Sequence, residues 1–274
     1  MSTPDGIVGP SGPGSALAGS PSDSHGPPSA VPGSWRDRIP RWIVRGLGVY
    51  TAAFLALFVV TQTVGPTDAK QHAIFLMAMG LILLWVVLGG LLTWRFRDRV
   101  RAWMLRQPGS GPLKFVLLAT AFVLVEEAIT TTMTNLAPEF GSKIGVAYIT
   151  ASTNYLLVIG FSSVVVIAPA FIGWGVLLRR YDFTPLEVFL LFGLLGTTGE
   201  ASLNPSALIA GFWFFVYGLM VYLPAYSLPT HRGAVTPRWY HYAMGYLVPL
   251  AFQLPFVVLA NVARAWLGIH LFPS

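Results

Sequence analysis

The chain contains no cysteine among its 274 residues. Disulfide bonds, thiolate metal sites and cysteine nucleophiles are therefore excluded. Charged residues are also scarce, because Asp, Glu, Lys and Arg together make up 10% of the sequence, whereas soluble domains carry about 25%. Hydrophobic residues make up 54%. This composition predicts a protein that lies in a lipid bilayer.

Motifs for soluble ligands are missing as well. The sequence has no P-loop and no GxGxxG motif after a strand pattern, so nothing in it supports nucleotide chemistry. The net charge is +6. The basic residues, however, stand at the ends of apolar segments instead of forming one patch. We therefore expect the lipid bilayer as a partner and no nucleic acid.

The N-terminal segment, residues 1–34, is rich in Pro, Gly and Ser and poor in large apolar side chains. Such a segment cannot bury enough surface to offset its chain entropy, so we predict a disordered cytoplasmic tail. It also lacks the basic start and early apolar run of a secretory signal. We therefore expect the first apolar run to be a retained anchor and residues 35–274 to form a transmembrane helical domain.

Long apolar runs fill the rest of the chain, and a helix needs about 20 such residues to cross the hydrocarbon core. The predicted fold class is all-α, a polytopic transmembrane helix bundle with about seven spans. The fourth run is too long for one straight span, so we expect it to be tilted, broken near Asn154 or Gly160, or partly interfacial. The expected spans are 42–64, 72–94, 113–135, 145–178, 185–203, 206–226 and 241–263.

The distribution of basic residues predicts the orientation. Fourteen Lys and Arg residues fall on the same side as the N-terminus, and three (Lys70, Lys143 and Arg264) fall on the other. Because cytoplasmic loops carry the excess of basic residues, we expect a multi-pass cell-membrane protein. Its N-terminus would be cytoplasmic and its C-terminus extracytoplasmic.

Two adjacent carboxylates, Glu126 and Glu127, interrupt the third apolar run. With a rise of ~1.5 Å per residue, Glu126 lies about 18 Å from the start of its helix, near the midplane of a core ~30 Å thick. Asn154, Glu200 and Gln253 fall at similar depths in three other spans. An acid at this depth costs about 2.5–3.5 kcal/mol and is by default a functional candidate. We expect at least one of the adjacent pair to be protonated, through desolvation and mutual repulsion.

Further polar residues extend from the glutamates toward the predicted outside. Glu127, Thr131 and Asn135 are spaced by four and so share one helical face. We predict a polar vestibule that opens to the outside and ends at the glutamates, with Glu127 facing it and Glu126 packed against a helix. The candidate residues for substrate or ion binding are Asn154, Gln253, Thr131 and Asn135.

A paired glutamate inside a span, a later polar motif and a downstream histidine resemble the glutamic intramembrane proteases, which include the CAAX-protease-like (CPBP) families. The matching residues are Glu126 and Glu127, Glu200 after "GLLGTTG", and His241 in "HYAMG". The resemblance implies a peptidase in which these residues are catalytic and the glutamates activate a water for attack on a peptide bond. The basic residue that usually follows the glutamate pair in that family is replaced here by Thr130 and Thr131. His241 is predicted near the cytoplasmic surface, roughly 20 Å from the glutamates in depth.

Other functions fit the same residues. No histidine is expected at the depth of the glutamates, so we expect no haem, no metal and no other cofactor. The glutamates could take protons or hold a cation or small polar ligand, in a proton-coupled, binding or transport protein. They could equally pair with a partner in an accessory subunit of a membrane complex. Asn154, Gln253 and Glu200 could also be hydrogen-bonded contacts between helices, worth about 0.6 kcal/mol each.

Overall fold

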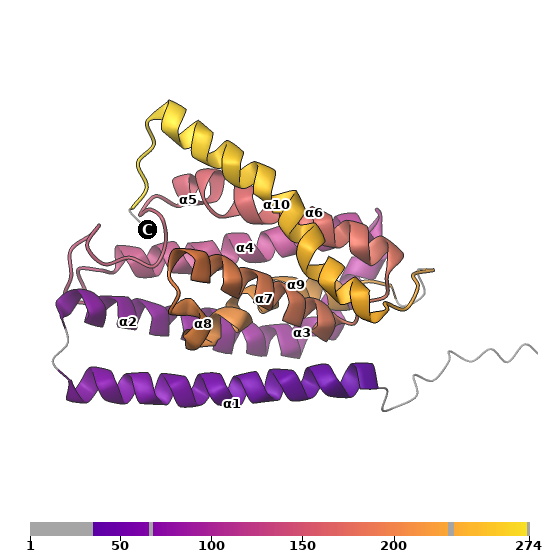
Figure 1. Cartoon of the computed structure of the whole chain (residues 1–274), viewed down its shortest axis with the longest axis horizontal. Helices are drawn as coiled ribbons and strands as arrows, with labels where there is room; N and C mark the ends of the chain where they lie inside the picture. The colour runs from indigo at the N-terminus through magenta and orange to yellow at the C-terminus, as the bar shows by residue number, and fades with distance from the viewer. Residues whose placement is uncertain (1–34, 66–67, 230–232, 273–274) are drawn as a thin grey trace, which may run out of the picture. The chain divides into compact units, whose positions relative to one another are not determined.

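The computed structural model describes residues 35–65, 68–229 and 233–272, and the predicted tail over residues 1–34 lies outside this range. Within the described residues the regular structure is helical, with two isolated β-bridges and no strand, so the all-α prediction is confirmed. Figure 1 shows α1 along one edge of the bundle and α10 crossing it obliquely. In chain order the helices are α1 (Trp35–Val64), α2 (Ala69–Leu81), the π-helix η1 (Ile82–Gly89), α3 (Gly90–Arg106), α4 (Gly111–Asn135), α5 (Tyr155–Phe161), α6 (Val164–Arg180), α7 (Pro185–Leu203), α8 (Ala207–Ala210), α9 (Phe212–Tyr226) and α10 (Trp239–Leu267).

By length and composition, four helices of the described chain could cross a membrane. The pair α5 and α6 makes a fifth if it is counted as one bent span, and α9 is apolar but shorter. A membrane-embedded helical protein is therefore supported, whereas the predicted count of about seven spans is not confirmed. The four helices are α1 over residues 38–64, the continuous rod α2–η1–α3, α7 and α10.

The predicted fourth span, 145–178, is not one helix. Residues 145–154 form turns and bends, α5 begins at Tyr155, and a break at Ser162 and Ser163 separates it from α6 at an angle of 45°. The Asn154 side chain accepts hydrogen bonds from the backbone N–H groups of Leu156 and Leu157, so it caps the start of α5. A cap residue stands outside the helix that it starts. For this reason the run begins its helix about ten residues later than predicted.

The predicted sixth span, 206–226, is interrupted in a similar way. The one-turn helix α8 ends at Gly211, which has a φ of +67° and from which α9 then starts. A positive φ of this kind favours glycine. A Cβ added at Gly211 would also lie 2.7 Å from the Thr51 hydroxyl of α1, so the break fits closely against that helix.

Glycine brings the central helices into close contact. A Cβ at Gly193 would collide with Phe214, and one at Gly196 would overlap the ring of Tyr217, so α7 and α9 pack almost backbone to ring. In the same way Gly173 of α6 lies against Pro249 of α10, where a Cβ would come within 2.9 Å of its Cα. Small residues allow this approach between helices in a membrane, where packing replaces the hydrophobic effect.

Hydrogen bonds tie together one end of the bundle. Arg36 at the start of α1 forms a bidentate ion pair with Glu187 near the start of α7, at 2.7 and 3.1 Å, and Tyr242 of α10 donates to the same carboxylate at 2.6 Å. Thr184 and Glu187, from the stretch "TPLE", form a capping box at the start of α7, so Glu187 has a structural role there. At this same end Tyr226, the last residue of α9, donates to Asp98 of α3.

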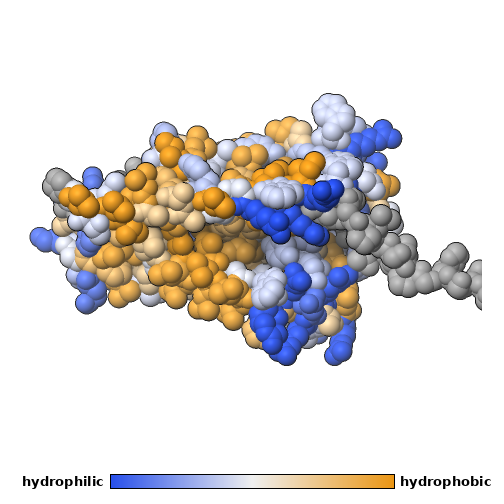
Figure 2. Space-filling model, turned by 90° about the horizontal axis from the view of Figure 1, so that it is seen from below, coloured by the Kyte–Doolittle hydropathy of each residue, from blue (hydrophilic) through white to orange (hydrophobic). Residues whose placement is uncertain are grey.

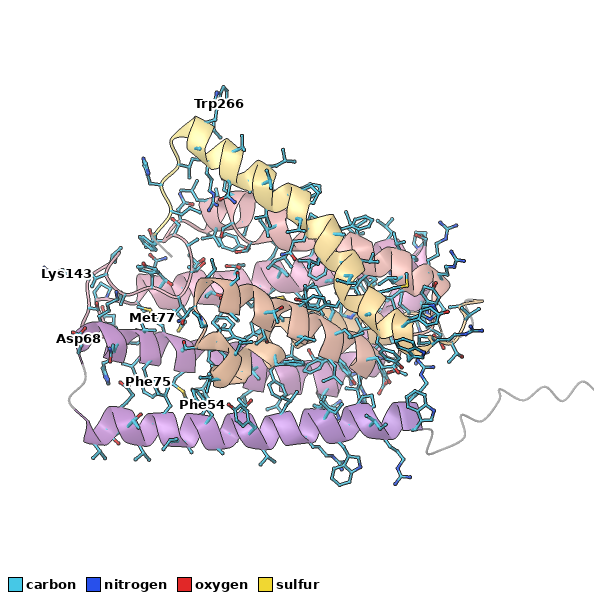
Figure 3. The ribbon with its side chains drawn as sticks, in the orientation of Figure 1. Phe54, Asp68, Phe75, Met77, Lys143 and Trp266 are labelled. Carbon is cyan, nitrogen blue, oxygen red and sulfur yellow. The ribbon has the colours of Figure 1, made fainter. Side chains whose placement is uncertain are left out.

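Polar side chains gather at the two ends of the described bundle. Figure 2 shows hydrophobic side chains across the middle and hydrophilic ones toward both ends. The end defined by Arg36, Asp98 and Glu187, called the basic end below, also carries arginines that the sequence assigns to the cytoplasm. Asp68 and Lys143 lie at the opposite end (Figure 3). The basic residues are thus sorted between two ends, as an oriented membrane protein requires.

Candidate functional site

The predicted glutamate pair lies in the interior of the bundle, on α4. Glu126 and Glu127 are 5% and 7% exposed. The Thr130 hydroxyl, one turn later, donates to the Glu126 carboxylate at 3.0 Å and also contacts the Glu126 carbonyl at 2.7 Å. The prediction that one of the two glutamates faces an open space therefore does not hold, because both are covered by neighbouring elements.

Glu127 meets residues from the broken segment that precedes α6. The Thr150 hydroxyl donates to its Oε2 at 3.4 Å, and the Ser163 hydroxyl also bonds to this carboxylate. Ser163 directly precedes the first residue of α6, a helix of 17 residues. The N-terminus of a helix carries a partial positive charge from its unpaired N–H groups. The break between α5 and α6, and with it the start of α6, therefore lies beside Glu127.

Glu200 joins the pair from α7. Both Glu126 and Glu127 interact electrostatically with Glu200, so the three carboxyl groups share one region of the bundle. The hydroxyl of Tyr217, on α9, donates a hydrogen bond to the half-buried Glu200. We call Glu126, Glu127 and Glu200 the carboxylate cluster.

Tyr217 reaches the cluster because of a glycine. Gly196 lies one turn before Glu200 on α7 and faces the Tyr217 ring so closely that a Cβ there would overlap it. The half-buried Tyr217 side chain also interacts electrostatically with all three glutamates. The sequence pattern does not single out Tyr217, which stands in the aromatic run "FWFFVYG" and looks like an ordinary core residue. The glycine spacing of α7, at 193, 196 and 199, is the signal that could have suggested a bulky partner.

The face of α4 that we expected to line a vestibule is covered. Residues 145–154, called the cover segment, lie over it. The Asn135 amide donates to the carbonyl of Thr153 at 3.0 Å, and the Ile149 N–H donates to the Thr134 hydroxyl at 3.2 Å. The sequence places polar residues on this face correctly, but their partners are this segment of the same chain instead of water. The vestibule is closed in this structure.

The chain after α10 also holds the cover segment in place. Phe272, beyond the end of α10, stacks on Tyr148 with ring centroids 4.7 Å apart, and its N–H donates to the Ala151 carbonyl at 2.7 Å. The chain after α10 therefore packs on the segment that closes the carboxylate cluster.

The four predicted ligand-binding residues lie in different environments. Thr131 is 4% exposed, and its hydroxyl finds no hydrogen-bond partner among the described residues, although it lies one turn from Glu127 on the same face. Asn135 binds the cover segment. Asn154 caps α5 and is exposed, so its predicted position in mid-span is wrong. Gln253 is half-buried on α10, and none of the hydrogen bonds found between described residues joins it to the cluster.

His241 lies away from the glutamates. Its Nδ1 accepts the backbone N–H of Arg238 at 2.8 Å, and its ring packs on Tyr181 and Tyr240 with centroids 4.0 and 4.2 Å apart. These contacts place it at the start of α10, at the basic end. The structure therefore brings three of the four candidate catalytic residues together and leaves His241 apart.

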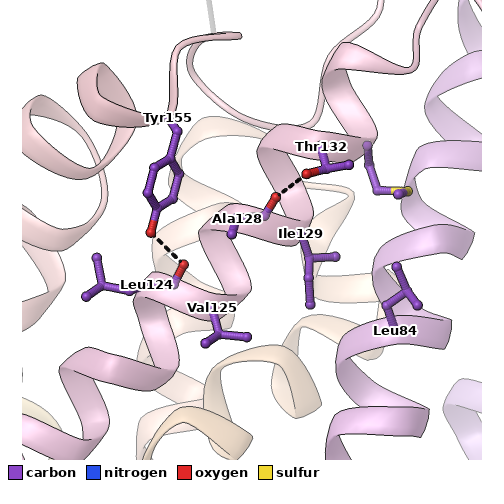
Figure 4. A pocket seen from close by; sticks show the side chains of 8 residues that line it. Leu84, Leu124, Val125, Ala128, Ile129, Thr132 and Tyr155 are labelled. Carbon is purple, nitrogen blue, oxygen red and sulfur yellow. Dashed lines mark hydrogen bonds between the residues drawn. The ribbon is translucent and has the colours of Figure 1, made fainter.

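On its other side α4 borders an apolar groove of about 480 Å³ (Figure 4). Leu84 of η1, Leu124 and Ala128 of α4 and Tyr155 of α5 are among the side chains that line it. Tyr155 crosses it to donate to the Leu124 carbonyl at 2.9 Å. None of the three glutamates lines this groove.

Within the described part of the chain, no group of three or more His, Cys, Asp or Glu side chains is arranged to hold a metal ion. Comparisons with protein-family models, with curated proteins and with solved structures found no match for this chain. The site is therefore interpreted from its own chemistry.

Proposed function

We propose that the carboxylate cluster is a proton-binding site inside the membrane, and that this protein is a proton-coupled membrane protein of the binding or transport class. The observation that carries the proposal is the convergence of Glu126, Glu127 and Glu200 with hydroxyl groups as their hydrogen-bond partners. Glu187 of the same molecule differs from these three, because its carboxylate is paired with the guanidinium of Arg36.

Electrostatics explains why such a cluster binds protons. Each buried carboxylate is penalised by the loss of hydration, and nearby carboxylates repel one another. An arginine or lysine within reach would relieve both effects, but no Lys, Arg or His side chain bonds to these carboxylates in the described residues. Hydroxyl groups donate only one hydrogen bond each. Protons are then the simplest positive charges that can neutralise the negative charge of the cluster. Carboxyl groups that interact this strongly take up and release protons as a coupled set.

The break between α5 and α6 fits the same function. Discontinuous helices are common where transport proteins bind charged groups in the membrane, because they present helix ends and unpaired backbone groups. Here the residue before α6, Ser163, interacts with Glu127, so the start of this helix lies next to the cluster. The unpaired hydroxyl of Thr131 adds a further polar atom without a protein partner among the described residues.

Proteolysis remains a prediction from the resemblance to glutamic intramembrane proteases. It would need a second group to act on the leaving amine or on the developing oxyanion, within hydrogen-bond reach of the substrate. His241, which the resemblance offered, packs between tyrosines at the basic end. We therefore propose proton binding ahead of peptide hydrolysis.

A lipid-soluble carbodiimide tests the proposal. Carbodiimides add to protonated carboxyl groups and spare carboxylates in ion pairs. We expect mass spectrometry of the protein, treated in vesicles at neutral pH, to find the adduct on at least one of Glu126, Glu127 and Glu200, with less adduct as the pH is raised. Glu187 is the internal control, because its ion pair with Arg36 should keep it unmodified.

Two results would count against proton binding. The first is the absence of any adduct on the cluster, and the second is an adduct that does not respond to pH. If sodium or potassium suppresses the modification at constant pH while choline does not, the site binds a metal cation in exchange for protons, and the proposal is replaced by that one.

A further inference from the structure

The rod formed by α2, η1 and α3 is much longer than a membrane core. It runs through 38 residues, from Ala69 to Arg106. At ~1.5 Å per residue this is about 57 Å, compared with about 30 Å for the hydrocarbon core, so about 27 Å of helix must lie beyond it. Its apolar part is at the Ala69 side, so the excess belongs mainly to the last turns of α3.

These last turns are dense in arginine. Residues 95–106 contain five arginines and one acid, Asp98, which gives a net charge of +4 over about three turns. The acid is already engaged, because Tyr226 donates to it at 2.6 Å and Arg97 lies 3.8 Å away. No other carboxylate forms an ion pair with this segment in the described part of the chain. Its positive charge is therefore largely uncompensated by the protein.

Four of the arginines are held in pairs over aromatic rings. The guanidinium groups of Arg97 and Arg101 both lie over the ring of Tyr226, 5.4 and 5.5 Å from its centroid. Those of Arg95 and Arg99 lie over the ring of Phe96 in the same way, at 5.7 and 5.5 Å. A guanidinium on a ring face still has N–H groups at its edge that can donate, although Arg97 also bonds to Tyr222. Stacking reduces the rotamer freedom that binding would otherwise remove.

Exposed tryptophans mark the depth of this segment. Trp94 and Trp103, which enclose the arginine pairs in sequence, are 64% and 56% exposed. Tryptophan concentrates at the level of the lipid headgroups, where its ring is partly in hydrocarbon and its N–H is in water. The arginine pairs between them then lie at the height of the lipid phosphates.

We propose that α3 and Tyr226 form a binding surface for the headgroups of anionic phospholipids in the leaflet at the basic end. The surface consists of Arg95, Arg97, Arg99 and Arg101 with the two rings that hold them. Two guanidinium groups on one ring can each donate two parallel N–H bonds to phosphate oxygens, the geometry that phosphate recognition favours. Clusters of basic residues next to a membrane helix attract anionic lipid in the same way. This proposal does not depend on the carboxylate cluster.

The test is a lipid titration of the full-length protein in a neutral detergent, with the melting temperature as the signal. We expect phosphatidylglycerol to raise the melting temperature and phosphatidylcholine to leave it nearly unchanged, since a ligand that binds the folded state stabilises it. Each basic residue near an anionic surface contributes about five-fold in affinity. The variant R97Q/R101Q should therefore need about thirty-fold more phosphatidylglycerol for the same shift.

The matched control is R179Q/R180Q, which removes the same charge from exposed arginines at the end of α6. It should need clearly less additional phosphatidylglycerol than R97Q/R101Q, because it removes charge at the same end without removing the ring-held guanidinium pair. The variant R97K/R101K, which keeps the charge but loses the planar donors, should lie between wild type and R97Q/R101Q. If R97Q/R101Q does not fold, R95Q/R99Q replaces it, since those side chains are exposed and leave Tyr226 untouched.

Three outcomes would overturn the proposal. One is an equal response of wild type to both lipids. Another is equal weakening in R97Q/R101Q and R179Q/R180Q, which would mean that any surface charge is sufficient. The third is a shift reproduced by inorganic phosphate at the same concentration, which would make a soluble anion the ligand.

Discussion

Replacing Gly196 by alanine should weaken the carboxylate cluster, although the change adds only one methyl group. In the structure this methyl group would overlap the ring of Tyr217, whose hydroxyl donates to Glu200. The ring is half-buried and packs against α7 at Gly196, so it has little room to move away on that side. We therefore expect Gly196→Ala to displace the ring and to lengthen or break its hydrogen bond with Glu200.

The magnitude follows from three opposing contributions. Overpacking in a tight interior costs about 1–3 kcal/mol, and the loss of a hydrogen bond to a neutral carboxyl group costs about 0.5–1.5 kcal/mol. Alanine in a helix gains about 0.5–1 kcal/mol over glycine. The net loss in the free energy of unfolding should then be about 0.5–4 kcal/mol. A loss of that size should lower the melting temperature by at least about 1 °C.

Gly199→Ala is the matched control, because it lies on the same helix and a Cβ there would meet no atom within 4 Å. It should melt at or slightly above the wild-type temperature. Tyr217→Phe, which removes only the donor, should lower the melting temperature as well. Its effect should not add to that of Gly196→Ala, because both act through one hydrogen bond. If Gly196→Ala is as stable as Gly199→Ala, the close packing of Tyr217 on α7 is refuted.

Three further predictions can be checked on the same purified protein or in cells. Glu200→Gln should melt within about 1 kcal/mol of wild type, because a neutral amide can accept the same hydrogen bond, yet it should abolish any proton-coupled activity; a large loss of stability at every pH would instead make Glu200 an ionised structural group. Glu187→Ala should reduce the free energy of unfolding by about 3–5 kcal/mol, since it leaves the guanidinium of Arg36 without its buried partner, and a loss below 1 kcal/mol in chemical unfolding would contradict that role. Single cysteines at Lys143 and Arg99 should be labelled from outside and from inside intact cells respectively, and the reverse pattern would overturn the proposed orientation.

The membrane class, the helical bundle and the cap of α7 could be predicted from the sequence because each depends on local information. Apolar run length determines whether a helix can lie in a bilayer, and the motif "TPLE" contains every side chain of its capping box. The depths of Glu126 and Glu200 follow from the helical rise alone. For the same reason the sequence could place these two residues at one level before any contact between them was known.

The cover segment could not be predicted in this way. Residues 145–154 begin with the apolar run "GVAYI", which looks like the start of a membrane helix. Only their hydrogen bonds to Thr134 and Asn135 and their packing on Phe272 show that they run across α4. Tyr217 was missed for a related reason, because its partner Glu200 is on another helix and its neighbours in sequence are all aromatic or apolar. Both features arise from tertiary packing, which overrides the pattern of a single segment.

The most direct test of proton binding is the infrared absorption of protonated carboxyl groups in the purified protein at neutral pH. The wild-type protein should show a carboxyl C=O band that decreases as the pH is raised, and the triple variant E126Q/E127Q/E200Q should lack it. The single variant E187Q should keep the band, because Glu187 is an ion-paired carboxylate. A wild-type spectrum without the band, or one that the triple variant reproduces, would show that the cluster holds no proton and would contradict the proposed function.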